Sequence, residues 1–206
     1  MAEFVIPCET LVRFSKILQD FPDGCCESFM CIRFEDDLVI ATNRAYMAVE
    51  HIGGGNTGSF FLKVDEALLA QCKGEAAFSS RLTITVTEML KHAVGKTTYG
   101  YVTPGNIGYF GEVSADWDRW ASIVGGAVTP AEKPRGGMYW DVAGLETLVG
   151  SSPSGKVVFE EVIDTTRPTL IRDITDPNWI GLFNPHNMRE TYQPATMPAW
   201  AKAVAK

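Results

Sequence analysis

Apolar residues in the N-terminal part of the chain recur at the spacing of a short amphipathic helix. They follow a 3-4-3 spacing and form one stripe: Leu11, Phe14, Leu18 and Phe21. Arg13 and Lys16 fall on the opposite side of this helix, which is the pattern of a helix with one buried face. The residues from Phe4 that precede it read as a short strand. The pattern therefore predicts a strand that leads directly into a helix.

The same strand-to-helix layout occurs three times. The segments are "FVIPCETLVRFSKIL" from Phe4, "FFLKVDEALLAQCKG" from Phe60 and "MYWDVAGLETLVGSS" from Met138. When they are stacked, apolar positions coincide in four columns: Ile6, Leu62 and Trp140; Cys8, Val64 and Val142; Leu11, Ala67 and Leu145; Phe14, Ala70 and Leu148. Acidic residues at the helix starts and glycines at the ends fit helix caps: Asp65, Asp141, Gly74 and Gly150.

Each helix is followed by three predicted strands. The first set comprises Phe29 to Phe34, Leu38 to Ala41 and Met47 to Ile52. The second comprises "RLTITV", "LKHAV" and "TTYGYV", and the third comprises "KVVFEEVI", "PTLIRD" and "WIGLF". The unit is therefore β-α-β-β-β, written three times. This predicts an α+β fold, with short helices packed on antiparallel sheets.

The repeats divide the chain into four parts. Residues 1–112 form a domain of two units, and residues 137–185 form a third unit, which is half a domain. Residues 113–136 are rich in glycine and proline and read as a linker. Residues 186–206 lack strand periodicity and read as a tail, whose end "PAWAKAVAK" forms either a short basic helix or a frayed terminus.

Composition limits the classes of function. The 206 residues are 46% hydrophobic and 21% charged, and no apolar run approaches the length of about 20 residues needed to span a bilayer. Glu3 stands where a signal peptide would carry positive charge, so we expect a cytoplasmic protein. The net charge of −7 argues against an extensive basic surface but does not exclude a local basic face. The five cysteines show no CxxC spacing and read as reduced thiols, and we expect no metal or cofactor.

Four phrases, in the right order, resemble bacterial DNA polymerase III beta sliding clamps. "LVIATNRAYMAVEHI" looks like the clamp stretch A-T-D-G-x-R-L-A, and "VSADWDRWASIV" like the F-P-D-Y-R-R-V-I-P segment that closes a clamp domain. "MYWDVAGLETLV" looks like the start of the last half-domain, and "TLIRDITDPNWIGLFNP" like the clamp terminus. On this resemblance, residues 1 to about 130 correspond to the middle domain of a clamp and residues 137–185 to the second half of its last domain.

The resemblance implies a DNA-clamp fold and a non-enzymatic function in DNA replication. A sliding clamp is a ring of twelve such units that encircles double-stranded DNA and tethers a polymerase, so three units per chain imply a homo-oligomer of four chains. The shortened architecture suggests a phage or mobile-element replication system. Helices that line such a ring direct basic side chains toward the DNA phosphates. The candidates here are Arg13, Lys16 and Lys73. The alternative for Arg13 and Lys16 is the water-exposed face of an amphipathic helix.

The resemblance also implies an apolar groove in which peptides of polymerases and clamp loaders dock. Its two walls would be Thr42, Arg44, Ala45, Tyr46 and Met47, and Leu182, Phe183, Asn184 and Pro185. Ala45 and Tyr46 stand where the family has histidine and arginine, so peptide preference is expected to differ. The alternative for Met47, Leu182 and Phe183 is ordinary core packing.

Two other functions fit parts of the sequence. Paired carboxylates in predicted turns would hold a divalent metal in a nuclease: Asp36, Asp37, Asp116 and Asp118. A nucleotide-binding function is not indicated, because "GGGNTGS" at Gly53 to Ser59 lacks the Lys-Ser/Thr ending of a phosphate-binding loop.

The second alternative to a sliding clamp is a clamp-fold adaptor or mimic that binds replication-protein peptides without encircling DNA.

Overall fold

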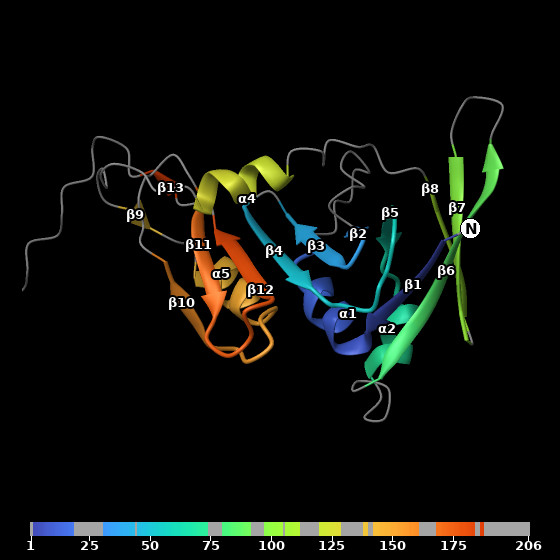
Figure 1. The fold of residues 1–206 in the computed structure, drawn as a ribbon, viewed down its shortest axis with the longest axis horizontal. Coiled ribbons are helices and arrows are strands. Elements are labelled where there is room, and N and C mark those ends of the chain that lie inside the picture. The colour runs from blue at the N-terminus through green and yellow to red at the C-terminus, as the bar shows by residue number, and fades with distance from the viewer. Residues whose placement is uncertain are drawn as a thin grey trace, which may run out of the picture.

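The computed structural model describes eleven stretches of the chain: residues 2–18, 31–43, 45–73, 80–91, 97–104, 106–111, 120–128, 138–139, 142–160, 168–183 and 186–187. They form a four-stranded, a seven-stranded and a two-stranded antiparallel sheet, with short helices on both sides of the seven-stranded sheet (Figure 1). This is the α+β architecture expected from the repeated pattern.

The first unit has the elements that its apolar pattern predicts. They are β1 (Ala2–Pro7), α1 (Cys8–Ser15), β2 (Cys31–Glu35), β3 (Leu38–Thr42) and β4 (Tyr46–His51). The predicted stripe of α1 is confirmed where it is described, because Leu11 and Phe14 are completely buried. Asp36, the first residue of the β2–β3 turn, has a φ of 50°, a left-handed conformation that aspartate tolerates better than most residues.

The second unit departs from the predicted pattern in its strands. Its elements are β5 (Ser59–Lys63), α2 (Glu66–Lys73), β6 (Arg81–Lys91), β7 (Thr97–Thr103) and β8 (Asn106–Gly111). The expectation of separate strands in "RLTITV" and "LKHAV" is wrong, because one strand, β6, runs through the first and into the second as far as Lys91, beyond which residues 92–96 lie outside the described residues. The fourth strand is β8, which was not predicted. Asp65 caps α2 as expected, accepting a hydrogen bond from the Leu68 amide at 2.8 Å.

The third unit follows the first closely. It contains β9 (Met138–Tyr139), α5 (Val142–Val149), β10 (Val157–Phe159), β11 (Thr169–Asp173) and β12 (Trp179–Phe183). The stacked sequences aligned Val142 with Cys8, and each is the first residue of its helix. The predicted linker contains a helix, α4 (Trp120–Val128), and the predicted tail contains a short strand, β13 (His186–Asn187), which pairs with β9.

The first two units form one domain by exchanging their first strands. β1 pairs with β6 and so belongs to the sheet β1-β6-β7-β8, which otherwise comes from the second unit. In return, β5 of the second unit pairs with β2 of the first. Each unit thus completes the sheet of the other.

The third unit joins this domain edge to edge. β12 pairs with β4 from Trp179–Glu50 to Phe183–Tyr46, which gives the continuous order β10-β11-β12-β4-β3-β2-β5. Helices α1, α2 and α5 lie on one side of this sheet and α4 on the other (Figure 1). We call these sides the helix face and the outer face. The main core lies on the helix face, where its largest side chains include Trp179, Phe4 and Phe14. No helix among the described residues is both long and apolar enough to cross a membrane.

Candidate functional site

The two expected walls of the peptide groove are neighbouring strands. In the β4–β12 ladder, Met47 lies opposite Leu182 and Tyr46 lies opposite Phe183. Thr42, at the end of β3, lies opposite Met47 on the other side of β4, and its hydroxyl donates to the Tyr46 carbonyl oxygen at 2.8 Å. The fold thus brings together residues that are about 140 positions apart in the sequence.

Alternation along the strands places these residues on opposite faces of the sheet. Met47 and Leu182 face outward and are buried there, with 6% and 2% of their surfaces exposed. Tyr46 and Phe183 belong to the helix face, where their rings stack with centroids 5.9 Å apart. Ala45 is exposed in the turn before β4. Three further expected wall residues lie outside the described residues: Arg44, Asn184 and Pro185.

Helix α4 covers Met47 and Leu182 on the outer face. Its first residue, Trp120, donates from Nε1 to the Glu35 carboxylate at 2.9 Å, which fixes that end of the helix beside β2. Ala127 near its other end is buried in the same apolar cluster as Met47 and Leu182. The sequence analysis missed this helix because its two adjacent glycines were taken as the mark of a linker. The apolar spacing of Trp120, Val124 and Ala127 was the available signal.

Partly exposed apolar residues surround this covered cluster. They come from α4 and from strands of all three units: Leu38, Phe61, Val124, Leu170 and Ile180. Ile123 of α4 is 39% exposed. The outer face therefore offers an apolar margin around α4, and residues of both expected walls lie beneath it.

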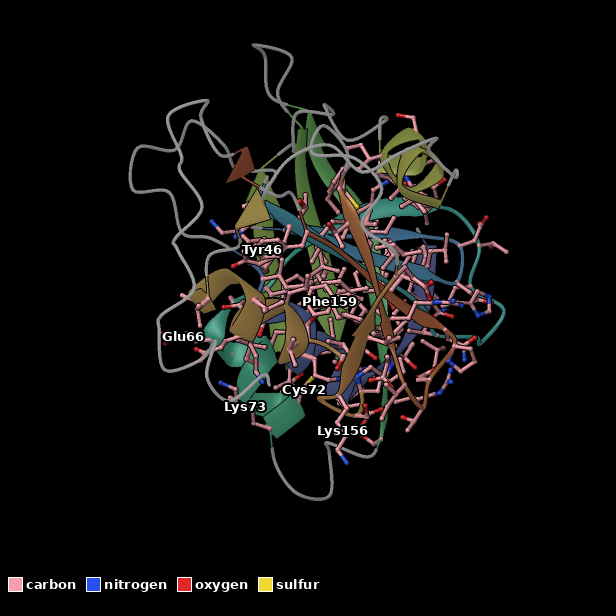
Figure 2. The ribbon with its side chains drawn as sticks, turned by 90° about the vertical axis from the view of Figure 1, so that its left-hand side faces the viewer. Tyr46, Glu66, Cys72, Lys73, Lys156 and Phe159 are labelled. Carbon is pink, nitrogen blue, oxygen red and sulfur yellow. The ribbon has the colours of Figure 1, made fainter. Side chains whose placement is uncertain are left out.

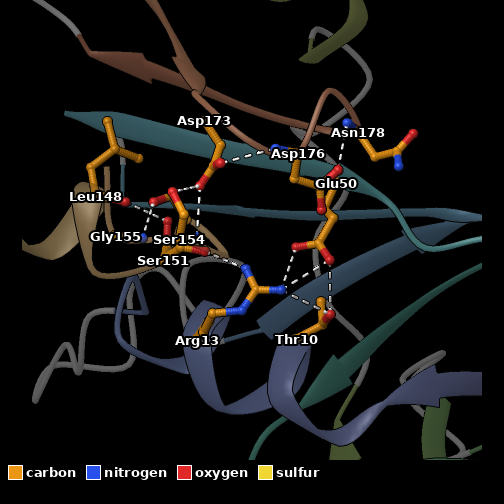
Figure 3. A network of polar contacts seen from close by, with 11 residues as sticks. Thr10, Arg13, Glu50, Leu148, Ser151, Ser154, Gly155, Asp173, Asp176 and Asn178 are labelled. Carbon is orange, nitrogen blue, oxygen red and sulfur yellow. Dashed lines mark hydrogen bonds and ion pairs between the residues drawn. The ribbon is translucent and has the colours of Figure 1, made fainter. Parts of the chain in front are cut away.

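Arg13 corrects the expectation of a DNA-facing side chain. It is buried, with 7% of its surface exposed, and its guanidinium forms an ion pair with the Glu50 carboxylate at 2.9 Å (Figure 3). Thr10 donates to the same carboxylate at 3.0 Å. The other nitrogen of the guanidinium donates to the carbonyl oxygen of Ser151, in the loop after α5. Arg13 thus joins the first unit to the third, and its guanidinium is engaged inside the protein.

The loop after α5 is held by hydrogen bonds centred on Asp173. Its carboxylate accepts from the amides of Ser154, Thr175 and Asp176, all at 2.8 to 3.0 Å (Figure 3). Burial raises the pKa of Asp173, but the hydrogen bonds from Ser154 and Thr175 outweigh it and hold the pKa well below its usual value. At Glu50 the balance is opposite: burial dominates and raises the pKa, although Arg13 and Thr10 oppose it.

The other two basic residues that were expected to face DNA, Lys16 and Lys73, are exposed on the helix face. Lys16 follows the last turn of α1, where its ammonium lies 3.4 Å from the Gly150 carbonyl oxygen, and Lys73 ends α2. Exposed carboxylates share these helices: Glu9 in α1, Glu66 in α2 and Glu146 in α5. Figure 2 shows Glu66 and Lys73 at the two ends of α2. The described helices thus present a mixed face, with lysines at helix ends.

The acidic turn Asp36–Asp37 is hydrogen-bonded to the glycine-rich loop Gly53–Ser59. Asp36 accepts from the Gly58 amide at 2.8 Å, and Asp37 accepts from the amides of Gly55 and Asn56 at 3.1 and 2.8 Å. Asp116 and Asp118 lie outside the described residues, and within the described ones no three His, Cys, Asp or Glu side chains gather as a metal site would require. The observed role of Asp36 and Asp37 is therefore structural.

Comparison with solved structures identifies the fold. The DNA polymerase sliding clamp of Pseudomonas aeruginosa matches 91% of this chain and 66% of its own, with a TM-score of 0.56 and 10% identity. The polymerase III subunit beta of Borrelia burgdorferi gives a TM-score of 0.60 at 8% identity, over 91% of this chain and 63% of its own. The Bacillus subtilis sliding clamp gives 0.54 at 11% identity, over 91% and 64%. No protein-family model and no curated protein matches the sequence.

The protein therefore has the fold of bacterial DNA polymerase III beta sliding clamps, which confirms the resemblance noted in the sequence. The chain spans slightly less than two thirds of the length of these clamps, with 63% to 66% of their residues covered.

Proposed function

We propose that this protein is a clamp-like processivity factor, which acts as a homo-oligomer in the cytoplasm and tethers a DNA polymerase or another replication protein to double-stranded DNA. It catalyses no reaction in this role. The observation that carries the proposal is the continuous seven-stranded sheet, which passes from one domain into the next through β4 and β12 with helices α1, α2 and α5 along one face. In a ring built from such segments, these helices would face the centre.

DNA contact in this proposal falls to Lys16 and Lys73, since Arg13 is engaged inside the protein. A closed ring needs few such contacts because it is held on DNA by its topology. The electrostatic attraction between the lysines and the phosphates weakens as the salt concentration rises. Exchanging both lysines for glutamate should shorten retention on DNA at low salt. The effect should diminish at higher salt, where screening weakens the contacts of the wild-type chain.

Peptide partners would dock on the outer face, at the apolar margin of α4 above Met47 and Leu182. This position combines residues of both expected walls with partly exposed Val124, Leu170 and Ile180. A clamp of Pseudomonas aeruginosa has been solved bound to griselimycin, which makes this compound a practical probe. Calorimetric titration of the protein with griselimycin, repeated with Val124→Glu, tests the surface. Loss of binding in this variant but not in Val102→Glu, on the separate four-stranded sheet, would support it.

Encirclement is tested by retention on DNA of different topology. The protein is incubated with a nicked circular plasmid, isolated with it on a sizing column at moderate salt, and analysed again after the plasmid has been linearised. A ring should stay on the circle and leave the linear molecule through its ends. Equal retention on both forms would instead indicate ordinary surface binding and would contradict the sliding mechanism.

The charges of the helix face favour a second candidate, an adaptor or mimic that binds replication-protein peptides without encircling DNA. Glu9, Glu66 and Glu146 oppose the two exposed lysines, and α5 carries no basic residue. Binding of griselimycin without retention on either plasmid form would identify this function. Retention on the circle alone would identify the processivity factor.

A further inference from the structure

The third unit presents the same helix side to its sheet as the first unit does. At equivalent positions of α1 and α5, Phe14 and Leu148 are both completely buried, and Thr10 and Gly144 are both buried as well. The two helices therefore have the same orientation on their sheets. Residues at any other equivalent pair of positions must point in corresponding directions.

The first position of these helices differs sharply in exposure. Cys8 of α1 is 2% exposed, because α2 packs beside α1 and places Cys72 next to the Cys8 thiol. Val142, the equivalent residue of α5, is 66% exposed. Within the described residues, α5 packs on β12 and β4, and the position that α2 occupies beside α1 is not filled by another helix. An apolar side chain thus points to where a second unit would lie.

The strands show the same difference. β2 of the first unit lies between β3 and β5, and β5 is the first strand of the other unit. Its equivalent in the third unit, β10, is the edge of the seven-stranded sheet, and Val158 on it is 47% exposed. An apolar edge strand is a surface that another strand can extend. β9, the first strand of the third unit, lies outside this sheet and pairs only with β13 among the described strands.

The third unit consequently carries both surfaces of the contact that joins the first two units; we call a contact of this kind the joint. In the first domain, each unit donates its first strand to the sheet of the other and packs its helix against the helix of the other. The third unit has the donor strand β9, the acceptor edge β10 and the uncovered side of α5. A surface that carries donor and acceptor together is self-complementary, and two-fold symmetry is the arrangement that satisfies both.

We propose that the third unit completes a clamp domain with the third unit of a second copy of this chain. β9 of each copy adds to β10 of the other, and the two α5 helices pack side by side about a two-fold axis. The resulting dimer holds six units, so that two dimers supply the twelve of a ring. This proposal rests on the homo-oligomer of the proposed function and specifies which surface builds it.

Two matched substitutions test the joint. Val142→Arg places a charge at the centre of the proposed contact without disturbing the monomer, since Val142 is mostly exposed. Ile123→Arg makes the same change on an exposed position of α4, on the opposite face of the sheet. Light scattering on a sizing column gives the mass of each over a concentration series. We expect wild type and Ile123→Arg to form even multiples of the 22.6 kDa chain. Val142→Arg should associate roughly tenfold more weakly or worse, because the joint would bury an unpaired charge.

A wild-type chain that stays monomeric at every concentration would overturn the proposal, as would an oligomer unaffected by Val142→Arg. In the second case the homo-oligomer stands and only its surface is wrong. Griselimycin binding and plasmid retention are measured separately, so failure of the joint is distinguishable from failure of the proposed function.

Discussion

The ion pair between Arg13 and Glu50 gives the most direct test of how the units are joined. Replacing Arg13 by methionine keeps an unbranched side chain of similar length but removes the guanidinium. Glu50 then stays buried and keeps the hydrogen bond from Thr10, and the Ser151 carbonyl oxygen loses the donor that ties the third unit to α1. If the pair were at the surface, this change would matter little.

The expected cost follows from burial. Both side chains of the pair are less than 10% exposed, at 9% for Arg13 and 8% for Glu50. Removing one partner of a buried pair costs about 3 to 5 kcal/mol, which for a chain of this size lowers the melting temperature by on the order of 10 °C. Protonation of Glu50 limits this cost. Its pKa is already raised by burial and rises further without Arg13, so the folded variant binds more protons than the unfolded chain. The loss of stability should therefore be larger at pH 8 than at pH 5.

Urea unfolding followed by circular dichroism measures this free energy at both pH values. Arg172→Met is the matched control, because Arg172 pairs with Glu160 but its side chain is 54% exposed. We expect it to lie within about 1 kcal/mol of wild type. The reasoning would be refuted if Arg13→Met were as stable as this control, or if its cost did not grow with pH. If Arg13 faced DNA, the Arg13→Met variant would be as stable as the control and would be retained less well on DNA.

Three further predictions address single groups. Asp173→Asn should remove a source of acid sensitivity: the lowered pKa of Asp173 stabilises the wild type above about pH 4, and this contribution is lost as pH falls below the unfolded value. Melting temperatures from pH 7 to pH 3 check it, and parallel curves for both proteins would contradict it. Cys72 should resist iodoacetamide at pH 8 in the native protein, since burial and the neighbouring Cys8 raise its pKa to about 12. Mass spectrometry of native and urea-treated samples measures this, and rapid native labelling would refute it. Gly181→Ala should cost about 1 to 3 kcal/mol by overpacking, because a Cβ there would meet the Trp179 ring at 2.7 Å and Leu148 at 3.3 Å. Gly155→Ala, with open space around the new methyl but a φ of 65°, separates crowding from backbone strain when both are unfolded in urea.

The repeat of the unit could be derived from the sequence because it depends on local periodicity. The helix stripe of Leu11 and Phe14 and the apolar runs that form β3, β4, β11 and β12 come from neighbouring residues, and the structure confirms each. Local patterns failed where the turn signals misled. β6 runs through a stretch that was divided in two, and α4 contains the glycines that suggested a linker.

The candidate site was predictable only in part. Thr42, Met47 and Leu182 were brought together as the resemblance implied, but their burial beneath α4 depends on a helix that the sequence analysis did not expect. The orientation of the Arg13 side chain could not be predicted from the sequence either. A basic residue on the polar side of a helix usually faces water, and its inward turn here requires Glu50 from β4 and Ser151 from the third unit.

The sequence by itself determined that three similar β-α-β-β-β units exist, because hydrophobic spacing, caps and turns act over a few residues. The tertiary structure decided which strands pair across units. The exchange of β1 and β5 and the joining of β4 to β12 are contacts between segments far apart in the chain, which no local pattern encodes. It also decided that, among the described elements, none covers one side of α5 and of β10. Exposure is a property of the whole assembly of elements, so an apolar residue such as Val142 looks the same in the sequence whether it is buried or left facing water.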